Sequence, residues 1–239
     1  MNYKIMVAII SLLILSGCGA TPIKPVSLSD TYYEEPKAIA VYVDTIPSKA
    51  KMTLPGASCL LCFVAADAAN SKVSSHVKTL STDEFSSVID SIQATLQDRG
   101  MTVHPASNLP FNQLPRFRNP GDTYARRDHR LLKNRVEADH LLVMRVRHVG
   151  VERTYANYVP TSSPQGVVLG ELYIVDLASN QYYLYLPLDF RVPVNGEWSE
   201  PPKFPGVTMA YYEAIERAKL AIHQAMEGAG VDYLVGEGL

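Results

Sequence analysis

The sequence predicts a single α/β domain of the α+β type, in which a four- to five-stranded, largely antiparallel sheet carries helices packed on a face. Apolar residues recur at helical spacing between Ser81 and Arg99, and they alternate along residues 182–192 as in a strand with one buried face. The chain has 239 residues, of which 47% are hydrophobic and 19% are charged. This composition excludes a disordered, a collagen-like and a disulfide-dense chain.

The elements are expected in the order strand, helix, strand, helix, strand, strand, strand, helix. The strands are predicted at 38–44, 101–104, 141–151, 167–177 and 181–192, and the helices at 81–99, 124–135 and 209–227. Three prolines in residues 18–36 predict an extended tether before the globular domain. The domain is expected to cover residues 37–227, with a C-terminal tail at 228–239.

The helix over residues 81–99 has signals at both ends. Ser81 and Glu84 match a capping box, and Gly100 follows where a left-handed C-cap is wanted. Two further signals concern the long strands. The apolar residues of 141–151 change sides near His148–Gly150, which predicts a bulge. Pro187 predicts either that its strand lies at a sheet edge or that it carries a bulge.

The first eighteen residues have the features of a signal peptide. One lysine precedes Ile5–Leu15, which is almost wholly apolar. A helix of this length spans about 16 Å, whereas the hydrocarbon core of a bilayer is about 30 Å thick. The segment is therefore too short to cross a membrane and suits a signal peptide. It ends in Leu15-Ser16-Gly17-Cys18, which resembles the bacterial lipobox.

The lipobox resemblance implies that Cys18 is the site of lipid attachment. It implies transfer of diacylglycerol to the thiol, removal of residues 1–17 as the signal peptide, and acylation of the new amine. Several acyl chains hold a protein stably on a membrane. An aspartate after the cysteine usually means retention in the inner membrane, so Gly19 favours the periplasmic face of the outer membrane.

The order of elements and one segment together resemble a group of small envelope lipoproteins. Val136–Val143 is similar to the "GADYLV" segment that enters a central strand in that group, with Glu137 where the group usually has glycine. The group includes proteins with a domain like the amino-terminal domain of TolB, the curli-secretion lipoprotein and lipoprotein activators of penicillin-binding proteins. The resemblance covers about residues 37–227. It implies a docking or assembly module and supplies no catalytic residues.

Cys59 and Cys62 form a C-x-x-C motif in an apolar setting. A four-thiolate zinc site would need a second cysteine pair, and an apolar setting raises the pKa of a thiol and so disfavours redox chemistry. A disulfide, which an oxidising envelope favours, and two buried free thiols both stay open. The surrounding residues 58–69 are almost continuously apolar and predict a buried core helix. The alternative is an exposed patch for a partner or for the membrane face.

Basic residues concentrate between positions 116 and 135. On a helix, Arg126, Arg130 and Lys133 would share a face, with Arg127 beside them. This surface could dock on phospholipid head groups, lipopolysaccharide phosphates or an acidic partner. The alternative is a solvated helix face. Tyrosines are also expected to gather in the sheet and its loop, either as an interface or as the cover of a half-exposed sheet; they are Tyr155, Tyr158, Tyr173, Tyr183 and Tyr185.

No catalytic signature is recognised in the sequence. The six histidines lack metal-ligand spacing, and neither a nucleophile elbow nor a phosphate-binding loop occurs. We expect no metal, no cofactor and, with 24 acidic against 22 basic residues, no nucleic acid. We expect a non-catalytic interaction or assembly factor, anchored to the membrane by its N-terminal lipid and bound to an envelope protein. The alternative is a binding protein for a lipid or glycan fragment.

Overall fold

The computed structural model describes residues 23–35, 37–44, 46–118 and 121–231. The expected signal peptide, Cys18 and most of the C-terminal tail lie outside the described residues.

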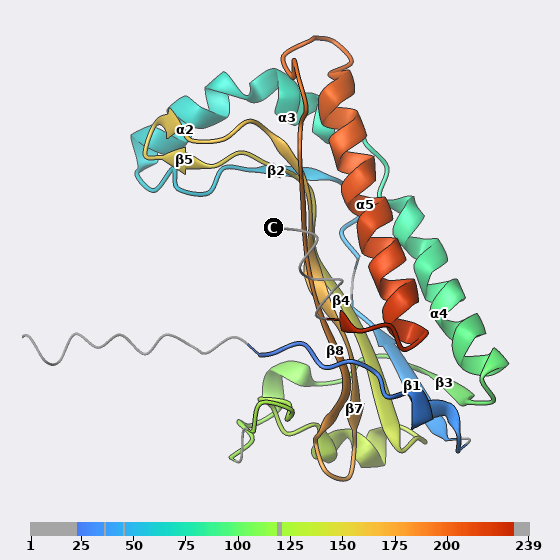
Figure 1. Ribbon diagram of the computed structural model, residues 1–239. Coiled ribbons are helices and arrows are strands. Elements are labelled where there is room, and N and C mark those ends of the chain that lie inside the picture. The colour runs from blue at the N-terminus through green and yellow to red at the C-terminus, as the bar shows by residue number, and fades with distance from the viewer. Residues whose placement is uncertain (1–22, 36, 45, 119–120, 232–239) are drawn as a thin grey trace, which may run out of the picture.

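A six-stranded mixed sheet forms the centre of the molecule (Figure 1). Its strands are β1 (Ala38–Val43), β2 (Lys51–Thr53), β3 (Thr102–Ala106), β4 (His140–Glu152), β7 (Gln165–Asp176) and β8 (Tyr182–Pro193). The order is β3-β1-β4-β7-β8, and β2 pairs with the far end of β4. β1 pairs in parallel with both β3 and β4, and β2 pairs in parallel with β4. The long strands β4, β7 and β8 pair with one another antiparallel. The predicted fold class is therefore confirmed, although the sheet has six strands rather than the four or five expected, the additional one being the short β2.

The long strands carry two irregularities. The register of β4 against β7 shifts between Val146 and His148, so the predicted bulge is confirmed. A second shift occurs where β7 meets the start of β8. It places Tyr182 on the opposite face from Leu184, so the alternation expected from residue 182 begins two residues later. β8 is an edge strand, which is one of the two alternatives that Pro187 left open.

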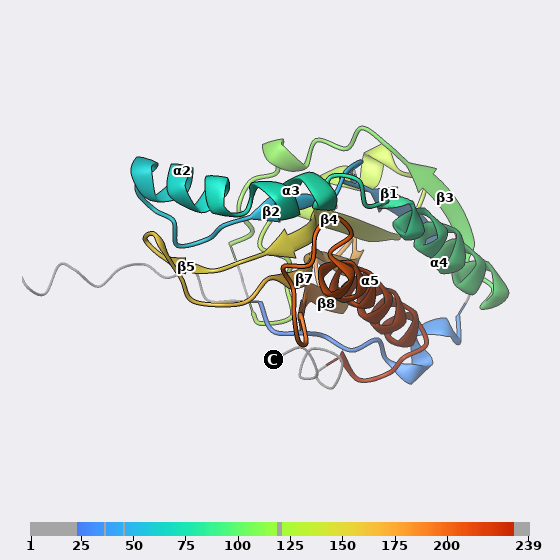
Figure 2. The same ribbon diagram turned by 90° about the horizontal axis from the view of Figure 1, so that it is seen from above.

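Two helices, α4 (Ser86–Asp98) and α5 (Pro205–Met226), cover one face of the sheet (Figures 1 and 2). The larger apolar core lies between these helices and the sheet. A single 3-10 turn, η3 (Asp83–Phe85), precedes α4, and the two together cover most of the predicted helix. The expected capping box does not form, because Ser81 Oγ accepts from the backbone N–H of Asp83 and no side chain caps the first turn of α4. Gly100 follows α4 with a φ of +81°, a conformation that glycine adopts without strain.

Residues 107–139 cover part of the other face and enclose a second apolar core. They contain two 3-10 helices, η4 (Phe111–Gln113) and η5 (His129–Arg135). The predicted helix over residues 124–135 is wrong for its first half, where Tyr124 and Arg127 form isolated β-bridges with other segments, and its second half is the 3-10 helix η5. The expected common helix face of the basic residues is therefore absent from this described segment.

Residues 23–35 belong to the body of the protein, although the sequence predicts a tether there. The backbone of Val26 pairs with that of Tyr185 on the free edge of β8, through two hydrogen bonds of 2.9 Å. Leu28 and Tyr32 are buried, the latter in the 3-10 helix η2 (Asp30–Tyr33). Extended, proline-containing backbone is suited to pairing with a strand edge, and these apolar side chains hold it there.

One part of the fold, here called the arm, projects beyond the sheet (Figure 1). It consists of residues 57–70, which include α2 (Leu60–Ala69), and residues 154–163, which include the hairpin of β5 (Tyr155–Ala156) and β6 (Val159–Pro160). Helix α3 (Ser71–Val77) connects α2 back to the body.

Candidate functional site

A polar cleft of about 670 Å³ opens between the sheet and the segment that covers its second face. Strands β1, β4, β7 and β8 supply its floor, and residues 109–129 supply its wall. The polar residues that line it include Tyr42, Asp44, Arg126, Arg145, Glu171 and Tyr182. Ile23, the first described residue, also lines the cleft.

An ionic network crosses the floor of the cleft. Arg145 donates through Nε to Asp44 at 2.9 Å and through Nη1 to Glu171 at 3.0 Å. Burial alone would lower the pKa of Arg145, but the hydrogen bond to Asp44 and the charge of Glu171 raise it. The guanidinium therefore stays charged and links three strands in a fixed geometry.

His129 and Tyr173 form the inner wall and hydrogen bond to each other. His129 Nδ1 lies 2.9 Å from the carbonyl oxygen of Arg127, and Nε2 lies 3.1 Å from the Tyr173 hydroxyl. A carbonyl only accepts, so Nδ1 donates and Nε2 accepts from the tyrosine. Burial lowers the pKa of His129 and raises that of Tyr173, which keeps both groups neutral at pH 7.

Asn180, in the turn between β7 and β8, holds the covering segment in place. Its Nδ2 donates to the carbonyl oxygens of Ala125 at 2.9 Å and Arg127 at 3.0 Å, and its Oδ1 accepts from the backbone N–H of His129 at 2.9 Å. Asn180 is fully buried and has a φ of +68°, which asparagine tolerates better than most residues. The backbone of Arg126 is thereby fixed from both sides. The sequence indicates only a turn here; the three bonds depend on the tertiary fold.

The structure divides the four predicted basic docking residues into two pairs. Arg130 forms two hydrogen bonds of 2.8 Å with Asp128, and Lys133 lies 3.6 Å from Asp139. Arg126 and Arg127 line the cleft instead. The two pairs therefore do not form one docking surface.

Several side chains that line the cleft have unused hydrogen-bonding capacity. Within the described part of the chain, the guanidinium of Arg126 has neither an ion pair nor a hydrogen bond. The same holds, within those residues, for the hydroxyls of Tyr42 and Tyr182. Arg127 donates one bond of 2.8 Å to the carbonyl oxygen of Leu114 and has further donors. The cleft thus presents charge and donors that a bound group could satisfy.

Of the two expectations for the tyrosines, the exposed interface is wrong for most of them. Tyr155, Tyr173 and Tyr185 are buried, and Tyr183 is partly buried. The covering segment and residues 23–28 enclose this face of the sheet, which the strand pattern alone did not reveal. Tyr158 is exposed, but it lies at the end of the arm rather than on the sheet.

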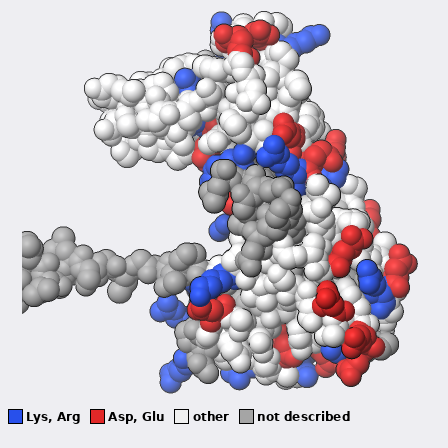
Figure 3. Space-filling model, viewed as in Figure 1, with Lys and Arg blue, Asp and Glu red and all other residues white. Residues whose placement is uncertain are grey.

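The arm exposes apolar side chains, so the prediction of a buried core helix over residues 58–69 is wrong. In α2, Leu60 and Leu61 are each 79% exposed, Phe63 is 50% exposed and Val64 is 55% exposed. Val159 on the hairpin is 52% exposed and lies beside Tyr158 in the chain. The arm is almost free of charged side chains in the view of Figure 3. The alternative expectation, an exposed apolar patch, describes this segment.

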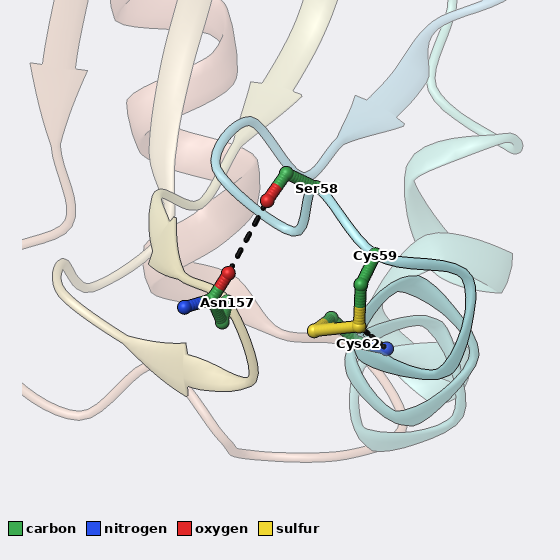
Figure 4. Close-up of a disulfide and its surroundings, with 4 residues drawn as sticks. All are labelled: Ser58, Cys59, Cys62 and Asn157. Carbon is green, nitrogen blue, oxygen red and sulfur yellow. Dashed lines mark hydrogen bonds between the residues drawn. A yellow bond between two sulfur atoms is a disulfide. The ribbon is translucent and has the colours of Figure 1, made fainter.

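Cys59 and Cys62 are joined by a disulfide at the start of α2 (Figure 4). Cys59 is the N-cap residue, and its sulfur accepts from the backbone N–H of Cys62 at 3.0 Å. Next to it, Ser58 donates to Asn157 on the hairpin at 3.2 Å. The disulfide therefore closes the first turn of the helix, where the two parts of the arm meet.

Reduction of this disulfide should loosen α2 without unfolding the body. The closed loop is short, so the entropic stabilisation is on the order of 2 kcal/mol, and α2 contributes only Cys62 and Ala66 to the buried residues. We expect faster amide exchange at residues 61–64 in a reducing agent and unchanged exchange in β4. Equal acceleration in both segments would contradict this expectation.

No family profile matches the chain, and no curated protein matches it. Among solved structures, the chain resembles lipoprotein GNA1162 from Neisseria meningitidis, with 13% identity over 76% of this chain and 99% of that one and a TM-score of 0.32. It also resembles a neuraminyllactose-binding hemagglutinin homolog from Helicobacter pylori, with 12% identity, coverage of 91% and 97% and a TM-score of 0.30. The hypothetical protein CT253 from Chlamydia trachomatis gives 10% identity, coverage of 79% and 98% and a TM-score of 0.31. Likenesses this distant assign neither a family nor a function.

Among the described residues, no group of three or more His, Cys, Asp or Glu side chains could hold a metal ion. No helix within the described ranges combines the length and hydrophobicity that a membrane span requires.

Proposed function

We propose that this protein is a lipid-anchored envelope protein that acts as a non-catalytic interaction or assembly factor. The lipobox supports attachment through Cys18 at the periplasmic face of the outer membrane. The order of elements resembles the group with TolB-like domains and supports a docking role. The observation that carries the proposal is the cleft, in which Arg126 has no ion pair within the described residues.

The chemistry of the cleft favours an acidic segment of an envelope protein as the partner. A carboxylate can bind a guanidinium through two parallel hydrogen bonds, and Arg126 and Arg127 both offer such donors. Arg145 is already bound by two carboxylates and serves to hold the floor. Burial shifts the pKa values of His129 and Tyr173, and these two side chains hydrogen bond to each other, which supports a structural role for the pair.

A cross-linking experiment in cells tests the cleft. A photo-crosslinking amino acid in place of Gln113, which lines the cleft, should capture one dominant envelope protein. The Arg126→Ala variant should lower this yield at least about tenfold, the equivalent of about 1.4 kcal/mol of binding. Arg118→Ala is the matched control, because Arg118 is exposed on the same segment and does not line the cleft. Equal capture by wild type and Arg126→Ala would sink the proposal.

The lipid anchor is tested separately. Labelled palmitate should enter the wild-type protein and should not enter the Cys18→Ala variant. Equal labelling of the two proteins would exclude Cys18 as the attachment site while leaving the cleft experiment valid.

The volume of the cleft favours one alternative function, the binding of a small envelope ligand. Pockets for such ligands measure about 300–1,000 Å³, and the cleft falls within this range at about 670 Å³. The ligand would be a lipid or glycan fragment with a phosphate or carboxylate group that Arg126 binds. Native mass spectrometry of protein purified from cells should then show a bound anion that Arg126→Ala loses, and Gln113 should capture no protein.

A further inference from the structure

We propose that the tip of the arm rests on the membrane leaflet that holds the Cys18 lipid. This inference rests on the proposed lipid anchor and names the surface that the arm contacts. The tip comprises the exposed apolar residues at the end of the arm, namely Leu60, Leu61, Phe63, Val64, Tyr158 and Val159.

The side chains that the tip exposes are of the kind that enters a membrane interface. Leucine, phenylalanine and valine gain free energy on leaving water, whereas tyrosine places an apolar ring and a polar hydroxyl at a membrane interface. The first turn of α2 exposes four such side chains within five positions, from Leu60 to Val64. A helix that lies on a bilayer buries an apolar face of this kind in the boundary between head groups and acyl chains.

The described residues of the arm carry almost no charge. In the described residues 57–70 and 154–163, Asp67 is the one ionisable carboxylate, and neither lysine nor arginine occurs. Asp67 lies near the end of α2, two turns away from Leu60. Charged side chains are costly to bury in a bilayer, and none interrupts the tip. An acidic or basic partner surface would find no complementary charge on this tip.

The chain between the proposed lipid on Cys18 and the body of the protein is short. Because residues 23–35 pack on β8, five residue steps separate Cys18 from Ile23, and they span at most about 18 Å. The body must therefore stay close to the leaflet. In Figure 1 the blue segment that begins at residue 23 reaches the same side of the molecule toward which the arm projects, and Figure 2 agrees.

Hydrogen bonds and a disulfide hold the two parts of the arm together. Asn70 donates to the Tyr155 hydroxyl at 2.6 Å, and Arg153 donates to the Asn70 side chain at 3.0 Å. These bonds join α2 and the hairpin at the base of the arm, and the disulfide closes the start of α2. A surface that is fixed in this way loses little conformational entropy on contact.

Fluorescence quenching by brominated lipids tests the inference. The lipidated protein is placed in vesicles of phosphatidylethanolamine and phosphatidylglycerol at 3:1, with or without bromine on the acyl chains. The reporter is Phe63→Trp combined with Trp198→Phe, which removes the one native tryptophan. The matched control is Leu220→Trp in the same background, because Leu220 is 58% exposed on α5, on the helix-covered side.

We expect brominated lipids to quench the Phe63→Trp reporter at least about twofold and to leave the Leu220→Trp control unchanged. Unquenched emission from Phe63→Trp, in protein that floats with the vesicles, would overturn the arm contact and leave the anchor intact. Protein that does not float with vesicles would overturn the anchor and the arm contact together. If a bound protein or a second copy covers the tip, the reporter also stays unquenched, which likewise overturns the inference.

Discussion

Replacement of Gly166 by alanine should destabilise the protein by about 3 kcal/mol. Gly166 lies in β7, where the backbone of α5 crosses the sheet. An added Cβ would overlap the carbonyl group of Ala210 and would lie 2.7 Å from the backbone nitrogen of Tyr211. Backbone atoms of a long packed helix cannot move aside as a flexible side chain can. The sheet and α5 would have to separate, and the larger core lies between them.

Urea unfolding of wild type and Gly166→Ala measures this cost. Gly230→Ala is the matched control, because a Cβ at Gly230 meets no described atom within 4 Å. The control should stay within about 0.5 kcal/mol of wild type. A midpoint for Gly166→Ala equal to that of the control would show that α5 does not approach β7 as closely as described.

Replacement of Asn180 by alanine should cost about 4 kcal/mol and should also disable the cleft. The side chain makes three hydrogen bonds to the backbone of residues 125–129. Loss of the bond to the buried carbonyl of Ala125 should cost about 1–3 kcal/mol, and loss of the bonds to Arg127 and His129 about 1 kcal/mol each. Alanine at a φ of +68° adds about 1–2 kcal/mol. The segment that carries Arg126 would lose its fixed position, so capture of a partner at Gln113 should fall together with stability.

Asn157→Ala separates the effect of buried bonds from that of backbone conformation. Asn157 also has a positive φ, of +58°, but it is exposed and its side chain accepts one bond, from Ser58. We expect a loss of about 1–2 kcal/mol for Asn157→Ala, with no change in capture at Gln113. Similar losses of stability for the two variants would mean that the bonds of Asn180 contribute little.

Strands β1, β3, β4, β7 and β8 and the two long helices could be predicted because their signals are local. The parity change near Gly150 marks the bulge, and the helical spacing between Ser81 and Arg99 marks α4. Each of these features depends on which side of a helix or strand faces the core. The spacing of apolar residues within one short stretch of sequence shows that side.

The basic segment could not be predicted in the same way. Residues 124–128 contain good helix formers, yet their backbone groups bond to Asn180 and to other distant segments. Local propensity amounts to a few tenths of a kcal/mol per residue, and several tertiary hydrogen bonds outweigh it. Arg126 lies in the same cleft as Tyr42 and Tyr182 because segments that are distant in the sequence meet there. No regular spacing of residues in the sequence predicts this group.

By itself, the sequence determined the fold class, the bulge, the edge strand and the expectation of a lipid on Cys18, because each depends on a short stretch of chain. The tertiary structure alone decided that residues 23–35 belong to the body, that the apolar residues of α2 are exposed, and that Arg126 lines a cleft. An apolar stretch of sequence looks the same whether its side chains are buried in the fold or exposed to solvent. Whether it is covered depends on which distant segment packs against it, and α2 projects past the end of the sheet that would have covered it.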